Sequence, residues 1–143
     1  MQKRKVTSEI IVHCAATPEG KDFTVADIDR WHKERGFQCI GYNYVIYRDG
    51  SIHQGRPEDA VGAHCTGHNS ISIGICYIGG CEAKKRSDGK YHAKDTRTPE
   101  QKRALRELLT RLKAKYPKAT IHGHREFANK SCPAFDVSEY ADI

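Results

Sequence analysis

Apolar residues along this chain follow two patterns, short β-branched runs and longer segments with helical periodicity. The short runs predict five strands, which cover residues 9–14, 42–47, 51–55, 71–80 and 119–124. An Asp-Gly pair at 49–50 separates the second run from the third and predicts a hairpin. The run at 71–80 is almost continuously apolar, as in a strand covered on both faces, so we expect it at the centre of the sheet.

Two segments carry the signals of amphipathic helices. Thr24 and Thr98 are N-cap residues, each followed three positions later by a capping-box side chain, and Gly36 and Pro117 mark the two ends. The order strand, helix, three strands, helix, strand predicts an α/β (α+β) fold with a central mixed β-sheet of about five strands flanked by helices. No linker or shift in composition divides residues 1–143, so we expect a single domain.

Composition and charge narrow the classes of function. A hydrophobic share of 38% and a charged share of 29% are typical of a folded globular protein, and no apolar run approaches the roughly 20 residues that cross a bilayer. The net charge of +6 comes from scattered cations, and the densest group, within 84–94, has only Tyr91 as an aromatic neighbour. We interpret that group as a solvated loop with some attraction for an anionic cell wall, and we expect no nucleic-acid partner and no membrane insertion.

The termini and the cysteines indicate the compartment. The N-terminus begins with basic residues but has no continuous apolar segment and no small-residue cleavage site, so we predict no signal peptide. Most of the six cysteines are expected to be reduced and buried, because the domain has no signal and is large enough to fold without disulfides. Whether Cys76 and Cys81 form a disulfide stays open.

Histidines and cysteines at the ends of the predicted strands suggest a metal site. His13 ends the first strand, His122 and His124 lie on or just past the last one, and Cys132 follows in a loop. A hydrolytic zinc site needs three N, S or O ligands and one open position for water. His122 and His124 share a strand face, so either one can point at His13. Either Cys14 or Cys132 can supply the sulfur, although strand alternation turns Cys14 away from His13 and favours Cys132.

Six ordered blocks spread over nearly the whole chain carry a resemblance to a known family. They are VHCAAT, WHKERG, GYNYVIYRDGSIHQGR, AVGAHCTGHNSISIGICYIGG, TPEQ and GHREFANKSCPAFD. Together they resemble the zinc amidases of the phage T7 lysozyme type. That family shares its fold with peptidoglycan recognition proteins and cleaves the bond between N-acetylmuramic acid and L-alanine.

The resemblance implies a role for particular residues. The matching positions make His13, His124 and Cys132 the ligands of one Zn²⁺ ion, and they make Tyr42 and Lys130 catalytic. A phenol and an ammonium are suited to hydrogen-bonding an oxyanion or to passing a proton to the leaving amine.

Two further residues, His64 and Asn69, match positions that line the substrate groove. Two departures from the family pattern bear on substrate specificity rather than on catalysis. Asn43 stands where the T7-like sequence has a histidine, and the loop 81–97 is more basic than expected.

The expected function is therefore a zinc-dependent N-acetylmuramoyl-L-alanine amidase that degrades peptidoglycan as a phage or prophage lysin. We expect a monomer that stays cytoplasmic until it is released to the cell wall. A cytosolic amidase that recycles soluble muropeptides is one alternative. A non-catalytic peptidoglycan-binding module is another, and it is disfavoured because such relatives usually lose the cysteine that is present here as Cys132.

Overall fold

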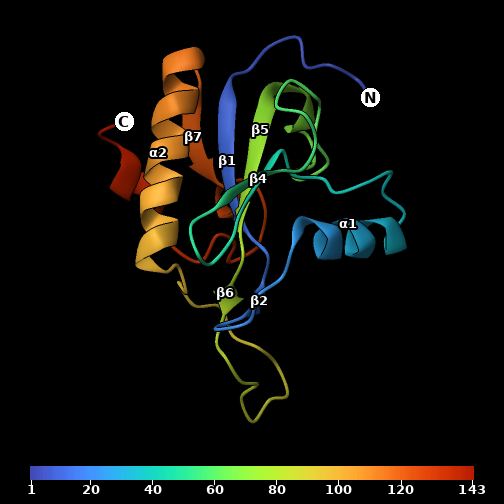
Figure 1. Cartoon of the computed structure of the whole chain (residues 1–143), viewed down its shortest axis with the longest axis vertical. Helices are drawn as coiled ribbons and strands as arrows, with labels where there is room; N and C mark the ends of the chain where they lie inside the picture. Colours follow the sequence, from blue (N-terminus) through green and yellow to red (C-terminus); the bar gives the residue numbers. More distant parts are fainter.

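A computed structural model describes all 143 residues and shows a five-stranded mixed sheet between two helices (Figure 1). The elements in chain order, with η for a 3-10 helix, are β1 (Glu9–Cys14), β2 (Thr17–Pro18), α1 (Val25–Glu34), β3 (Tyr44–Ile46), β4 (Ile52–Gln54), η1 (Asn69–Ile71), β5 (Ser72–Tyr77), β6 (Gly80–Cys81), α2 (Pro99–Lys115), β7 (Thr120–Gly123), η2 (His124–Glu126) and η3 (Val137–Tyr140). The predicted fold class is confirmed.

The sheet has the strand order β4-β3-β5-β1-β7. The apolar strand β5 lies at its centre, as predicted, and pairs in parallel with both β1 and β3. The predicted hairpin joins β3 and β4, which form the one antiparallel pair of this sheet. The prediction of one strand over 71–80 is too long. Gly79 and Gly80 adopt positive φ angles of 126° and 105°, so the chain turns after Tyr77, and β6 pairs with β2 in a separate two-stranded sheet.

The larger core lies between α2 and one face of the sheet. Strand alternation directs Ile10, Val12 and Cys14 toward α2, while His13 faces the opposite side. The leucines of α2 fill this core with 1% or less of their surface exposed, and they are Leu105, Leu108, Leu109 and Leu112. Burial of each such side chain contributes about 1.5–3 kcal/mol. One face of β1 therefore packs in the core, and the side chains of the other face, including His13, are available for a functional site.

The starts of both helices follow the predicted capping chemistry. Both capping boxes are present, with the Thr24 and Thr98 side chains accepting from the backbone N–H three residues later. Gln101 also donates from its side chain to the carbonyl groups of Ile46 and Ile78, at 3.3 and 2.9 Å, and so ties the start of α2 to the sheet. The helix α1 packs on the other face of the sheet through a smaller apolar cluster that contains Ile28 and Val45.

The basic segment 81–97 is a hairpin-like excursion that projects beyond β2 and β6 (Figure 1). Backbone hydrogen bonds across it join Glu82 to His92 and Arg86 to Lys90. Neither helix combines the length and the apolar composition of a membrane-spanning segment. All six cysteine thiols are free, which answers the question left open for Cys76 and Cys81.

Asn43, one of the departures from the family pattern, is completely buried and does not line the pocket described below. Its amide oxygen accepts from the N–H of Gly74 at 2.9 Å, and its amide nitrogen donates to the carbonyl groups of Pro57 and Ala60 at 2.9 and 3.1 Å. Asn43 therefore connects β3, β5 and the loop that follows β4, and its role is structural.

Replacing Asn43 by alanine is expected to lower the free energy of unfolding by about 1–3 kcal/mol, because the buried N–H of Gly74 loses its acceptor. The carbonyl groups of Pro57 and Ala60 each lose one donor and keep another, from the N–H of Ala60 and the guanidinium of Arg4. Urea unfolding monitored by circular dichroism measures the change. The exposed amide of Gln38 provides a matched control, since Gln38→Ala is expected to leave stability unchanged. Equal stability of the two variants would contradict the structural role.

Candidate metal centre

A pocket of about 570 Å³ opens on the side of the sheet away from α2. None of its 18 lining residues is acidic, and Arg35 and Lys130 are its cations. The pocket brings together all seven residues singled out from the sequence, namely His13, Tyr42, His64, Asn69, His124, Lys130 and Cys132. These residues come from strand ends and loops that are up to about 120 positions apart in the chain, and parallel strand pairing makes them neighbours.

Three of these side chains form a compact cluster. His13, His124 and Cys132 each offer one potential ligand atom, and these atoms lie within 4.8 Å of one another. The register of the sheet explains the proximity of the two histidines, because Val12 in β1 lies opposite Gly123 in the parallel strand β7. The residue that follows each of these two positions in the chain is one of the two histidines, and their ring centroids are 4.5 Å apart.

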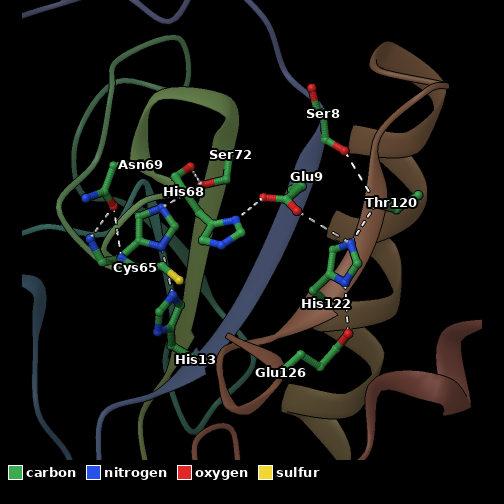
Figure 2. A network of polar contacts seen from close by, with 11 residues as sticks. Ser8, Glu9, His13, Cys65, His68, Asn69, Ser72, Thr120, His122 and Glu126 are labelled. Carbon is green, nitrogen blue, oxygen red and sulfur yellow. Dashed lines mark hydrogen bonds and ion pairs between the residues drawn. The ribbon is translucent and has the colours of Figure 1, made fainter. Parts of the chain in front are cut away.

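His122 lies outside this cluster. The expectation that His122 and His124 share a strand face is wrong, because β7 ends at Gly123 and His124 begins the 3-10 helix η2. The two nitrogens of His122 instead contact Thr120 Oγ1 at 2.6 Å and Glu126 Oε1 at 2.9 Å (Figure 2). Of the two histidines, His124 is the one that faces His13.

The two candidate sulfurs are also distinguished by their surroundings. Cys14 is buried in the core on the α2 side of the sheet, while its backbone N–H donates to the sulfur of Cys132 at 3.1 Å. A hydrogen bond with Cys132, together with burial, raises the pKa of the Cys14 thiol, so Cys14 stays protonated. Cys132 is held by its own loop, where its carbonyl accepts from the N–H of Arg125 at 2.7 Å. Both cysteines line the pocket, and Cys132 is the one whose sulfur lies close to the ring nitrogens of His13 and His124.

The electrostatics of the cluster suit a metal cation. Burial lowers the pKa of His13 well below its usual value, and burial together with the charge of Lys130 lowers the pKa of His124. Both imidazoles are neutral at pH 7, which is the form that binds a metal. Two imidazoles and one thiol are a donor set that Zn²⁺ accepts in catalytic sites, where a fourth position stays open to water. The residues present therefore fit a metal ion.

Burial of His64 predicts that the metal-free protein loses stability in acid. Burial lowers the pKa of His64 to about 3, whereas an unfolded histidine titrates near 6.5, so the unfolded state binds more protons below pH 6.5. The stabilisation is complete above pH 6.5 and falls by about 1.4 kcal/mol for each pH unit below it. Urea unfolding in chelator at pH 7.5 and 5.5 measures this loss. In His64→Asn the free energy of unfolding is expected to fall less steeply below pH 6.5, by about 1.4 kcal/mol less per pH unit than in the wild type. The same steepness in this variant and in the wild type would contradict the prediction.

Tyr42 and Lys130 flank the cluster from different segments. Tyr42 directly precedes the buried Asn43 and β3, and its ring centroid lies 5.0 Å from that of His13. Burial, followed by the nearby Cys76 thiol, raises the pKa of the Tyr42 phenol well above its usual value, so the hydroxyl remains a donor at neutral pH. Lys130 is exposed on the loop that leads to Cys132, and it lines the pocket.

His64 and Asn69 line the same pocket, and both also have contacts within the protein. The side-chain oxygen of Asn69 accepts from the backbone N–H groups of His64 and Cys65 at 2.8 and 2.9 Å. His64 Nδ1 lies 2.8 Å from Nε2 of His13. Sequence reasoning missed this pairing, because no local pattern relates residues 51 positions apart.

His32, Arg35 and Phe127 also line the pocket and were not singled out as site residues from the sequence. His32 is a buried residue of α1, and its Nδ1 accepts from the N–H of Gly41, next to Tyr42, at 2.8 Å. Arg35 and Phe127 follow a helix end and a short 3-10 helix, where periodicity gives no orientation.

Comparison with known proteins agrees with this geometry. The sequence model of the family described as N-acetylmuramoyl-L-alanine amidase matches residues 2–135. The endolysin of Klebsiella phage KP32 is 44% identical over 138 residues, which are 96% of this chain and 87% of the relative. The endolysin of Escherichia phage T7 is 42% identical over 139 residues, which are 97% of this chain and 88% of the relative.

Solved structures show the same similarity. The N-acetylmuramoyl-L-alanine amidase LysC from Clostridium intestinale superposes with a TM-score of 0.78 at 30% identity, and the match covers 95% of this chain and 83% of that one. Wild-type Drosophila PGRP-LB superposes with a TM-score of 0.75 at 25% identity, and covers 99% of this chain and 82% of that one.

Proposed function

The chain belongs to the N-acetylmuramoyl-L-alanine amidase family and is an endolysin-type amidase that cleaves peptidoglycan, and we propose that its activity depends on one zinc ion bound by His13, His124 and Cys132. The observation that carries the proposal is the meeting of these three donors at one end of two parallel strands. Zinc, when bound, supplies a Lewis acid and lowers the pKa of a water ligand to about 7.

The chain's own residues then act on the substrate. A neutral amide is a poor electrophile, so its carbonyl oxygen needs donors as negative charge develops on it. We assign this role to the Tyr42 hydroxyl, which stays protonated. We assign to the Lys130 ammonium the stabilisation of the same charge from the exposed rim and the delivery of a proton to the leaving amine of L-alanine.

The rest of the pocket is suited to an anionic substrate. Peptidoglycan stem peptides carry carboxylates, and a pocket with two cations and no acidic side chain attracts them. We assign His64 and Asn69 to the wall of this groove, His64 with a further role described below. We also propose that residues 1–143 act as one monomeric catalytic domain that reaches the cell wall after release from the cytoplasm.

Digestion of purified sacculi with and without a chelator tests the proposed function. We expect release of stem peptides that begin with free L-alanine, loss of this release in chelator, and its recovery on addition of zinc. The new amino termini are identified by dansylation and mass spectrometry. Release that survives complete metal removal would contradict the zinc assignment. New reducing sugar ends in place of new amino termini would contradict the amide as the bond that is cleaved.

A muropeptide-recycling amidase is the alternative within the same class, and the similarity to phage endolysins over nearly the whole chain favours the lysin. Turnover of intact sacculi and of soluble muropeptides separates the two. We expect intact sacculi to be cleaved efficiently, and activity confined to soluble muropeptides would favour recycling.

Replacing Lys130 by alanine is expected to lower kcat by about 100-fold, because a positioned proton donor contributes at least that much. The affinity for zinc is expected to stay the same, because Lys130 is not one of the three donors. Steady-state turnover of sacculi measures the effect, with Lys84→Ala on the projecting hairpin as a control at an exposed lysine. Equal turnover by both variants would remove Lys130 from the mechanism.

A further inference from the structure

The ring of His64 contacts the ring of a proposed metal ligand edge-on. His64 Nδ1 lies 2.8 Å from Nε2 of His13, the ring centroids are 4.9 Å apart and the planes meet at 87°. A hydrogen bond between two neutral imidazoles requires one N–H donor and one bare acceptor. The direction of this bond decides which nitrogen of His13 remains free to bind a metal.

The contact of His64 with Ser72 sets the direction of the hydrogen bond between His64 and His13. The hydroxyl of Ser72 donates its single proton to the carbonyl oxygen of His68 at 2.7 Å (Figure 2). Ser72 Oγ can therefore only accept from Nε2 of His64, which lies 3.3 Å away. With its proton on Nε2, His64 offers Nδ1 as an acceptor, so Nε2–H of His13 is the donor. The bare nitrogen of His13 is then Nδ1.

The fold leaves space for His64 in this position. A Cβ atom at Gly62 or at Gly74 would lie only 2.6 Å from Cδ2 of His64. The ring of His64 therefore fits because both of these positions are glycine. The backbone N–H of His64 is fixed by Asn69. The orientation of His64 is therefore imposed by its surroundings and does not depend on a bound metal.

We infer that His64 is a positioning residue that holds His13 in the Nε2–H tautomer and directs Nδ1 of His13 toward the metal. The chain of contacts runs from Ser72 through His64 to His13. This inference rests on the proposed zinc site and gives His64 a role beyond lining the groove. A partner on the second nitrogen of a metal-ligating histidine typically contributes a factor of about 10 to 100 in metal affinity or activity.

The tautomer of His13 can be measured in the metal-free protein. Long-range ¹H–¹⁵N correlation spectra of the ¹⁵N-labelled chain at pH 7.5 are expected to show His13 and His64 both protonated on Nε2. In His64→Asn the side-chain oxygen replaces the Nδ1 acceptor, and His13 is expected to keep its tautomer. In His64→Ala the acceptor is lost, and His13 is expected to populate both tautomers. A proton on Nδ1 of His13 in the wild-type protein would overturn the inference.

Zinc affinity, measured by competition with a chromogenic chelator, provides the second readout. We expect the dissociation constant to rise by about 10- to 100-fold in His64→Ala, to recover in His64→Asn, and to stay unchanged in His92→Ala on the projecting hairpin. Equal zinc affinity of His64→Ala and the wild type would overturn the positioning role. A wild-type protein that binds no zinc would instead refute the proposed function, and the spectra would still test the contact between His13 and His64.

Discussion

Replacing Cys132 by serine is expected to abolish stoichiometric zinc binding and to reduce peptidoglycan hydrolysis to below about one thousandth of the wild-type rate. Loss of a metal ligand should cost more than the roughly 100- to 1000-fold that removal of one oxyanion donor costs, because both the activated water and the Lewis acid are lost. Metal content by atomic emission after dialysis and the release of L-alanine amino termini measure the two effects.

Cys14→Ala is the matched control for Cys132→Ser. Only the side chain of Cys14 changes, and the backbone N–H that donates to Cys132 remains in place. We expect this variant to retain its zinc and to lose only some stability from the small cavity in the core. The reverse result, with zinc retained by Cys132→Ser and lost by Cys14→Ala, would assign the sulfur ligand to Cys14.

Replacing Tyr42 by phenylalanine is expected to lower kcat by about 100- to 1000-fold while the zinc affinity and the thermal midpoint stay close to those of the wild type. The ring is kept, so its packing against His13 is preserved, and only the hydroxyl that we propose as a donor to the developing oxyanion is removed. Turnover of sacculi together with zinc titration separates a catalytic effect from loss of the metal.

Tyr44→Phe is a useful comparison, because the Tyr44 hydroxyl donates to Glu58 at 2.6 Å and does not line the pocket. We expect nearly wild-type turnover from this variant. Equal losses in Tyr42→Phe and Tyr44→Phe would indicate that the tyrosines act through folding, and full activity of Tyr42→Phe would exclude its hydroxyl from the reaction.

Much of the fold could be predicted from local chemistry. The capping boxes at Thr24 and Thr98 and the Asp-Gly turn are decided within a few residues of sequence, and the structure contains all three. The end of β5 was harder to predict. The apolar pattern continues through Ile78, which is buried against Ile28 and Val45, so hydrophobicity did not reveal the turn at Gly79.

The site was predictable in its residue types and only partly in its arrangement. Alternation along β1 separates His13 from Cys14, and the structure places them on opposite sides of the sheet. The choice between His122 and His124 could not be made from the pattern, since it depends on where β7 gives way to η2. The contact between His13 and His64 depends on the space above Gly74, which appears only once the strands are assembled.

The projecting segment 81–97 offers a practical opportunity. No residue between Glu82 and Thr96 lines the pocket, and the segment leaves and rejoins the fold outside the five-stranded sheet. Doubling the length of a flexible loop costs only about 0.6 kcal/mol in closure entropy. A targeting peptide inserted near Gly89 would therefore change which bacterial surfaces the enzyme adheres to, while the chemistry at the candidate metal centre stays the same.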